Sequence, residues 1–277
     1  LSRGRSCNNC ATGFVVAIDA LPDYYCPSCG GLEIVAGNQV LAVDLVTGDL
    51  SVAAQAAAPL GDGFTSTADF DGDGDLDGIV MSSENDRWLC YVWDLQTPEI
   101  IRGPYFSNAS SIDGPTAGRP VVADLTGDGQ LELAFSTTSS LVILDNNLSG
   151  PLDPFTLDDP SHSIGVVAFD FFRDGAAELV YRDVNALHIF DFLNNQHAEF
   201  DCHSGTFTEY PLILDVDADG QTEILTTCGP SNEDGQVLAC ESAATPWAVT
   251  RPVWNQPHFF NLHVSDDLSI PPHQGNP

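Results

Sequence analysis

The sequence contains no lysine, a single methionine and no apolar run long enough to cross a membrane. Its eight basic residues are all arginine and are outnumbered by 40 acidic residues, so the formal net charge at pH 7 is -32. A surface with that charge repels nucleic acid and anionic lipid, and we therefore expect no nucleic-acid binding and no membrane insertion. The chain starts at Leu1 with neither an initiator methionine nor a signal peptide, which predicts a processed segment.

The rest of the composition is that of a folded protein. Hydrophobic residues make up 43% of the chain and charged residues only 17%, so a sizeable core can form and the acidity is not that of a disordered tail. Of the 40 acidic residues, 30 are aspartate. This bias indicates that the aspartates serve local sites.

A repeated acidic motif divides the sequence. Each copy has an apolar segment, an aspartate that opens a glycine-containing acidic loop, and a second apolar segment. The copies occupy residues 68–81, 123–136, 169–182 and 214–227, and their first aspartates are Asp69, Asp124, Asp170 and Asp215, spaced 55, 46 and 45 residues apart. A degenerate fifth copy lies upstream, where residues 13–19 and 31–38 are separated by a cysteine-bearing insertion. Such a period is typical of one blade of a propeller.

The apolar segments beside each loop are short and β-branched, which predicts two strands joined by a tight loop. A third strand is expected after each copy, a weaker fourth strand before the next, and no segment shows a sustained helical period. We therefore predict an all-β fold, a β-propeller of five or six four-stranded blades with calcium loops between strands 1 and 2. A sandwich or jelly roll does not explain the repeat. The expected organisation is an N-terminal cysteine-containing segment (1–12), the propeller repeats (13–250) and a tail (251–277) that closes the propeller or contacts a partner.

The first acidic loop has the pattern of a calcium site. Carboxylates stand at positions 1, 3, 5 and 9, Gly74 at position 6 permits a sharp bend, and a backbone carbonyl is available at position 7. Ca²⁺ takes six to eight oxygen ligands, and alternate residues of a turning loop can point inward to supply them. The predicted ligand residues are Asp69, Asp71, Asp73, Asp75 and Asp77.

Two further copies keep this pattern. One contributes Asp215, Asp217, Asp219, Gln221 and Glu223, and the other contributes Asp124, Thr126, Asp128, Gln130 and Glu132, with the Thr126 hydroxyl in place of a carboxylate. In the fourth copy Phe172 occupies position 3, and we expect Arg173 to replace calcium electrostatically there. No site is predicted for Asp19, Asp23 and Glu33. A solvated turn or an EF-hand are the alternatives, but repetition in register argues against the first, and the second requires flanking helices and a glutamate at position 12.

These motifs resemble the FG-GAP or VCBS repeats of bacterial secreted and cell-surface proteins, whose blades are similar to those of the integrin α propeller. The resemblance covers roughly residues 13–250, and residues 241–271 are similar to a stretch that follows such repeats. It implies a calcium-stabilised extracellular propeller that binds ligands on the face opposite the calcium loops. The chain departs from it in the fourth loop, in the interrupted first loop and in having five clear copies where integrin-like propellers have seven.

Eight cysteines favour an oxidising, extracellular location. The spacing of Cys7, Cys10, Cys26 and Cys29 fits either structural Zn²⁺ or, as we favour, disulfides. A bridge is expected among Cys202, Cys228 and Cys240, whereas Cys90 lacks an obvious partner.

No catalytic motif is present, and we assign the seven histidines to packing. Loops expected opposite the calcium face are Arg87 with Trp88, residues 102–119 and residues 203–210, where exposed arginine and aromatic side chains suit a surface glycan or protein. The predicted function is therefore an adhesion or glycan- or protein-binding module that is not an enzyme. A self-assembling subunit of an extracellular fibre or surface layer is the alternative, and a polysaccharide-cleaving enzyme is a second one.

Overall fold

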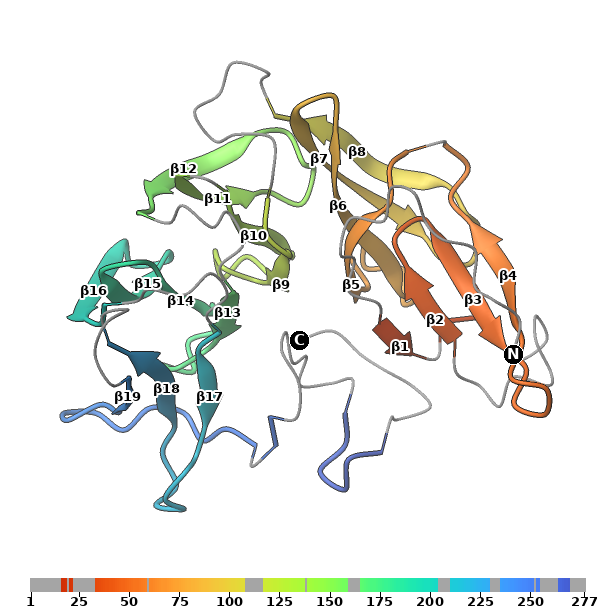
Figure 1. Ribbon diagram of the computed structural model, residues 1–277. Helices are drawn as coiled ribbons and strands as arrows, with labels where there is room; N and C mark the ends of the chain where they lie inside the picture. Colours follow the sequence, from red (N-terminus) through yellow and green to blue (C-terminus); the bar gives the residue numbers. More distant parts are fainter. Residues whose placement is uncertain are drawn as a thin grey trace.

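Figure 1 shows the computed structural model of the chain, which describes residues 16–18, 20–21, 33–58, 60–107, 117–137, 139–158, 165–203, 210–229, 235–251, 253–254 and 264–269. The described residues form strands and turns, with no helix. Accordingly, they include no helix long and apolar enough to span a membrane.

The strands form five separate antiparallel sheets, in each of which consecutive strands are neighbours. The first sheet contains β1 (Val16–Ile18), β2 (Glu33–Ala36), β3 (Gln39–Val43) and β4 (Leu50–Gln55), and the second contains β5 (Gly63–Ala68), β6 (Asp77–Glu84), β7 (Arg87–Asp94) and β8 (Ile100–Phe106). The third contains β9 (Val121–Ala123), β10 (Glu132–Ser136), β11 (Ser140–Leu144) and β12 (Pro151–Thr156). The fourth contains β13 (Val166–Phe169), β14 (Glu178–Arg182), β15 (Ala186–Asp191) and β16 (Gln196–Asp201), and the fifth contains β17 (Leu212–Leu214), β18 (Glu223–Cys228) and β19 (Gln236–Cys240).

The predicted β-propeller is wrong. The all-β class and one sheet per repeat are present, but the five sheets stay separate and none closes or curls into a propeller. First strands of neighbouring sheets contact each other from β1 to β5, β5 to β9 and β9 to β13, and the sheets follow one another along an open arc (Figure 1). The last sheet has three strands, because the described residues after β19 contain no further strand. The repeat specifies each sheet, whereas closure depends on contacts between distant copies that no motif encodes.

The hydrophobic core lies between consecutive sheets. In β6, Ile79 and Met81 pack in a cluster with residues of the third sheet, whereas Val80 packs with residues of the first. Two similar clusters join the third sheet to the fourth and the fourth to the fifth. Both faces of the middle strands are therefore buried, which explains why these strands have continuous apolar runs instead of alternating ones.

A disulfide and two tryptophans reinforce the junction between the fourth and fifth sheets. A disulfide joins Cys202 to Cys228, which confirms a bridge among the three C-terminal cysteines and leaves Cys240 free. Trp247 and Trp254 pack against the cluster between the fourth and fifth sheets. Cys90 is buried and free, as its lack of a partner predicted. The four cysteines at positions 7, 10, 26 and 29 lie outside the described residues.

Candidate metal-binding loops

Each complete acidic loop connects the first strand of a sheet to the second, as predicted. The loops follow β5, β9, β13 and β17, and we name them loops A (residues 69–77), B (124–132), C (170–178) and D (215–223). The backbone has positive φ at positions 4 and 6 of all four, for which glycine is best suited. These residues are Gly72 and Gly74, Gly127 and Gly129, Arg173 and Gly175, and Ala218 and Gly220.

The position-1 aspartate organises the turn in loops A, B and D. In loop A, Asp69 Oδ1 accepts a hydrogen bond from Gly72 N at 2.8 Å and Asp69 Oδ2 accepts one from Gly74 N at 3.1 Å. Asp124 and Asp215 accept the equivalent pairs of bonds. In loop C, the backbone donors to Asp170 are Asp174 and Gly175. The carboxylate thus helps to hold the backbone of the loop in shape.

The position-9 acid closes each loop from inside. It accepts a hydrogen bond from the position-2 backbone N–H at 2.8 Å in loops A, B and C and at 2.7 Å in loop D. The four acids are almost wholly inaccessible to solvent; they are Asp77, Glu132, Glu178 and Glu223. In the degenerate first copy, buried Glu33 makes the same closure with Ala20 N at 3.0 Å, so this feature survives the insertion.

Burial makes these acids costly to ionise. It raises the pKa of Asp77 to about 8, the pKa of Glu132 to about 7 and the pKa of Glu178 to about 8, and nearby carboxylates add to the effect. Burial likewise raises the pKa of Glu223. A cation beside such a group would favour its charged form, so the buried acid favours the binding of a cation in the loop.

Loops A and D bring three carboxylates together. Ligand oxygens of Asp69, Asp71 and Asp77 lie within 4.8 Å of one another, and so do those of Asp215, Asp217 and Glu223. Calcium–oxygen distances of roughly 2.3 to 2.6 Å allow two ligands of one ion to be up to about 5 Å apart. The predicted residues Asp73, Asp75 and Asp219 lie outside these trios and are exposed.

Buried oxygens without hydrogen-bond partners also indicate metal binding in loops B and D. Glu223 Oε1 and Gln221 Oε1 in loop D have no hydrogen-bond partner, although Gln221 Nε2 donates to Glu241. In loop B the carboxylates do not gather into such a trio among the described residues, but the Thr126 hydroxyl is buried and unpartnered. A hydroxyl at this position is the expected neutral substitute for Asp71, and its missing partner fits a metal ligand. Asp128 and Gln130 of this loop are exposed.

Loop C lacks the third oxygen. Phe172 is 54% exposed at position 3, and Arg173 is exposed as well. The ion pairs recorded among described residues do not include Arg173, so no contact supports its predicted replacement of calcium.

The loops predicted to form a ligand-binding face differ from the expectation, because Trp88 is not an exposed aromatic side chain. Trp88 is 3% exposed and packs edge-on against Phe135, with ring centroids 5.0 Å apart. The Arg87 guanidinium lies 4.8 Å from the centroid of Phe106. Trp88 is therefore part of the core between two sheets, and residues 108–116 and 204–209 lie outside the described part of the chain.

One group of side chains that could hold a metal ion was not predicted. His188, His197 and Glu199 lie together on the fourth sheet, away from the acidic loops. The sequence held one indication of this group. His197 and Glu199 are two residues apart in the strand expected to pair with the strand of His188, so they share one face of it.

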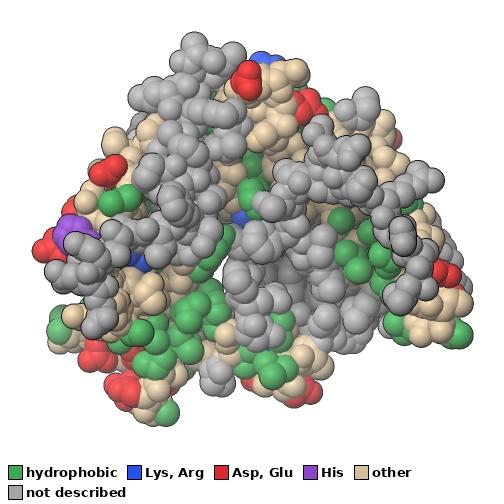
Figure 2. Space-filling view, in the orientation of Figure 1, with side chains coloured by type: hydrophobic (Ala, Val, Ile, Leu, Met, Phe, Trp, Pro, Cys, Tyr) green, Lys and Arg blue, Asp and Glu red, His purple; other side chains and the backbone are tan. Residues whose placement is uncertain are grey.

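Figure 2 shows acidic side chains at several separate places around one face of the molecule, with few basic ones between them. No protein-family model matches the chain, and no curated protein matches it either. Among solved structures, the chain is similar to the V. cholerae biofilm matrix protein Bap1, with a TM-score of 0.67 and 13% identity over 95% of this chain and 68% of that one. It also matches an Agrocybe aegerita lectin that recognises non-reducing terminal N-acetylglucosamine, with a TM-score of 0.43, 13% identity and coverage of 83% and 66%. The first likeness is one of fold.

Proposed function

We propose that this chain is an extracellular scaffold, stabilised by calcium, that acts as an adhesion module by binding a surface glycan or protein. The observation that carries the proposal is the convergence of carboxylates in loops A and D at the same point of two repeats. Loop B is proposed to bind more weakly, because a neutral hydroxyl takes the place of one carboxylate. Loop C is proposed to bind none.

The residues that would hold the ions are the trios of loops A and D and, in loop B, Asp124, Thr126 and Glu132. When bound, Ca²⁺ supplies positive charge that offsets the repulsion among the carboxylates. The chain itself provides the geometry, since the closing hydrogen bond of each loop joins the position-9 acid, which is the first residue of the second strand, to the backbone N–H at position 2. Metal binding would therefore stabilise the junction between the first two strands of a sheet.

The extracellular setting is supported by the Cys202–Cys228 disulfide and by the fold shared with a biofilm matrix protein. A binding role rather than a catalytic one suits a rigid scaffold of repeated sheets, although fold alone does not define a function. An acidic surface that repels nucleic acid and anionic lipid leaves neutral glycans and proteins as the natural partners.

Two experiments test this function. Calorimetric titration of chelator-treated protein with CaCl₂ should show two tight sites and a weaker third. Retention of the protein on immobilised neutral polysaccharides, or on glycan arrays, should then fall when EGTA removes calcium. Binding of no calcium would overturn the scaffold proposal, and calcium binding without any retention would overturn the adhesion proposal alone.

A further inference from the structure

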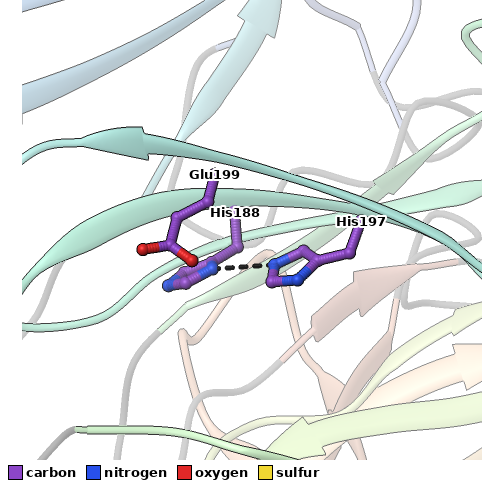
Figure 3. A group of neighbouring side chains, drawn as sticks. All are labelled: His188, His197 and Glu199. Carbon is purple, nitrogen blue, oxygen red and sulfur yellow. Dashed lines mark hydrogen bonds between the residues drawn. The ribbon is translucent and has the colours of Figure 1, made fainter.

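The hairpin of β15 and β16 places three ligand-type side chains on one face. His188 lies directly opposite Glu199, and Phe190 lies opposite His197, so the two histidines are diagonal neighbours. Ligand atoms of His188, His197 and Glu199 lie within 4.8 Å of one another (Figure 3). The pairing register of β15 and β16 is therefore what assembles the group.

We propose that His188, His197 and Glu199 form a binding site for a divalent transition metal of the zinc type. Two imidazoles and one carboxylate are a donor set that suits Zn²⁺ and leaves a fourth coordination position open. The site is separate from the acidic loops, whose oxygen ligands suit calcium, and it does not depend on the function proposed above.

The two rings already present nitrogens to each other. His188 Nδ1 lies 2.9 Å from His197 Nε2, and the ring planes differ by 18°. Two nitrogens bound tetrahedrally to one Zn²⁺ at 2.0–2.1 Å are roughly 3.3 Å apart, so the rings need to separate by a few tenths of an ångström. His197 and Glu199 are exposed on β16, the edge strand of the sheet, and can make this adjustment.

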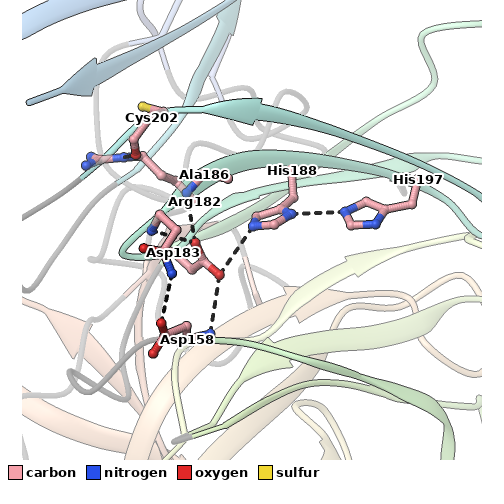
Figure 4. A network of polar contacts seen from close by, with 8 residues as sticks. Asp158, Arg182, Asp183, Ala186, His188, His197 and Cys202 are labelled. Atoms are coloured by element: carbon pink, nitrogen blue, oxygen red, sulfur yellow. Dashed lines mark hydrogen bonds and ion pairs between the residues drawn. The ribbon is translucent and has the colours of Figure 1, made fainter.

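A carboxylate behind His188 orients its ring. Asp183 Oδ2 lies 3.3 Å from His188 Nε2, and Asp183 Oδ1 accepts hydrogen bonds from Asn185 N and Ala186 N, both at 2.9 Å (Figure 4). This contact favours the proton on Nε2 and leaves the Nδ1 lone pair facing His197. A histidine ligand commonly contacts a carboxylate through its second nitrogen in this way, so Asp183 is a positioning residue.

The surroundings of His188 restrict the position of its ring further. Tyr181 stacks on His188 with ring centroids 4.7 Å apart and planes 14° apart, which restricts the ring of the buried histidine.

A hydrogen-bonded histidine pair is the simpler explanation, but it accounts only for the contact between the rings. It gives no role to Glu199 on the same face. The two explanations predict different zinc stoichiometries. If the histidines only bond to each other, the wild-type protein binds no more zinc than a variant that lacks His197.

The test is calorimetric titration of the full chain with ZnCl₂ in excess CaCl₂, so that the acidic loops are saturated. Wild-type protein should bind one more zinc ion than His197→Ala, and Glu199→Gln should weaken this site by about tenfold, or about 1.4 kcal/mol. Asp201→Asn removes a carboxylate from the same strand, opposite Ala186, and should leave the affinity unchanged within about twofold. These three residues are exposed, so the variants should fold.

Cobalt substitution checks which residues bind, since thiolate ligands give charge-transfer bands and imidazole and carboxylate ligands do not. We expect that the cobalt absorption present in wild type and absent from His197→Ala contains no thiolate bands. Equal zinc stoichiometry and affinity in wild type and His197→Ala would overturn the proposal. So would a spectrum in which the difference between the two proteins consists of thiolate bands.

Discussion

Loops A and C have nearly the same backbone but different chemistry. Both have positive φ at positions 4 and 6, and in both the buried position-9 acid accepts a hydrogen bond of 2.8 Å from the position-2 N–H. Loop A gathers three carboxylates, whereas loop C has Phe172 where loop A has Asp71. The hydrogen bonds give the two loops a similar shape, and the side chain at position 3 supplies the third carboxylate in loop A but not in loop C.

The two loops also differ in how the buried charge can be offset. The pKa is raised to about 8 for both Asp77 and Glu178. In loop A the neighbouring carboxylates can hold a cation that stabilises the ionised acid. In loop C a proton is the simplest means of neutralising Glu178, because Arg173 is exposed and forms no ion pair with it.

Removal of calcium is expected to have the largest effect. Each site saturated at 100 times its Kd contributes about 2.7 kcal/mol of stability. With two or three sites, EGTA should lower the melting temperature by on the order of 10 °C or more. Differential scanning calorimetry measures this, with MgCl₂ as the control ion. An unchanged melting temperature would show that calcium occupies none of the loops.

Substitutions in single loops should affect calcium binding and stability in loop A but not in loop C. Asp71→Ala should remove one calcium ion from the calorimetric stoichiometry and about 2 to 3 kcal/mol of stability in saturating calcium. Asp73→Ala should also lower calcium-dependent stability, because we expect this exposed side chain to turn inward and bind the ion. Asp174→Ala in loop C should do little in either measurement. A loss in Asp174→Ala as large as that in Asp71→Ala would indicate that loop C is occupied as well.

The reverse exchange should give loop C a site. The double substitution Phe172→Asp with Arg173→Gly restores position 3 and places glycine at a residue whose φ is 58°. Calcium should then raise the melting temperature further than in wild type, by roughly 2 to 4 °C for each kcal/mol gained. The matched control is Arg173→Gly alone, which should show no added response to calcium. An identical response in both variants would show that position 3 does not decide occupancy.

The smallest effect concerns pH. Glu178 has a folded-state pKa of about 8, above its ordinary value near 4.5, because of burial. The folded protein therefore holds a proton that the unfolded chain releases, and its stability should fall as pH rises from about 5 to 8. In saturating calcium, Glu178→Gln should flatten this pH dependence. Denaturant midpoints across that range measure it, and an unaltered slope would contradict a buried protonated Glu178.

Spacing alone predicted the parts of the fold that local chemistry controls. The Asp-to-Asp period located four loops between the first and second strands, and the acid at position 9 recurs at each of them. Ring closure was not predictable, because it depends on contacts between the first and last repeats. The burial of Trp88 was missed for a related reason, since its neighbour Phe135 belongs to the next repeat. The pairing of His188 with His197 required a strand register that sequence spacing does not fix.

Crystals of the chain grown with CaCl₂ would test the central claim most directly, through anomalous difference density measured at a long wavelength. The account predicts peaks inside loops A and D, a weaker peak inside loop B and none in loop C. Density absent from loops A and D, with the carboxylates of Asp69, Asp71 and Asp77 directed toward solvent, would contradict it.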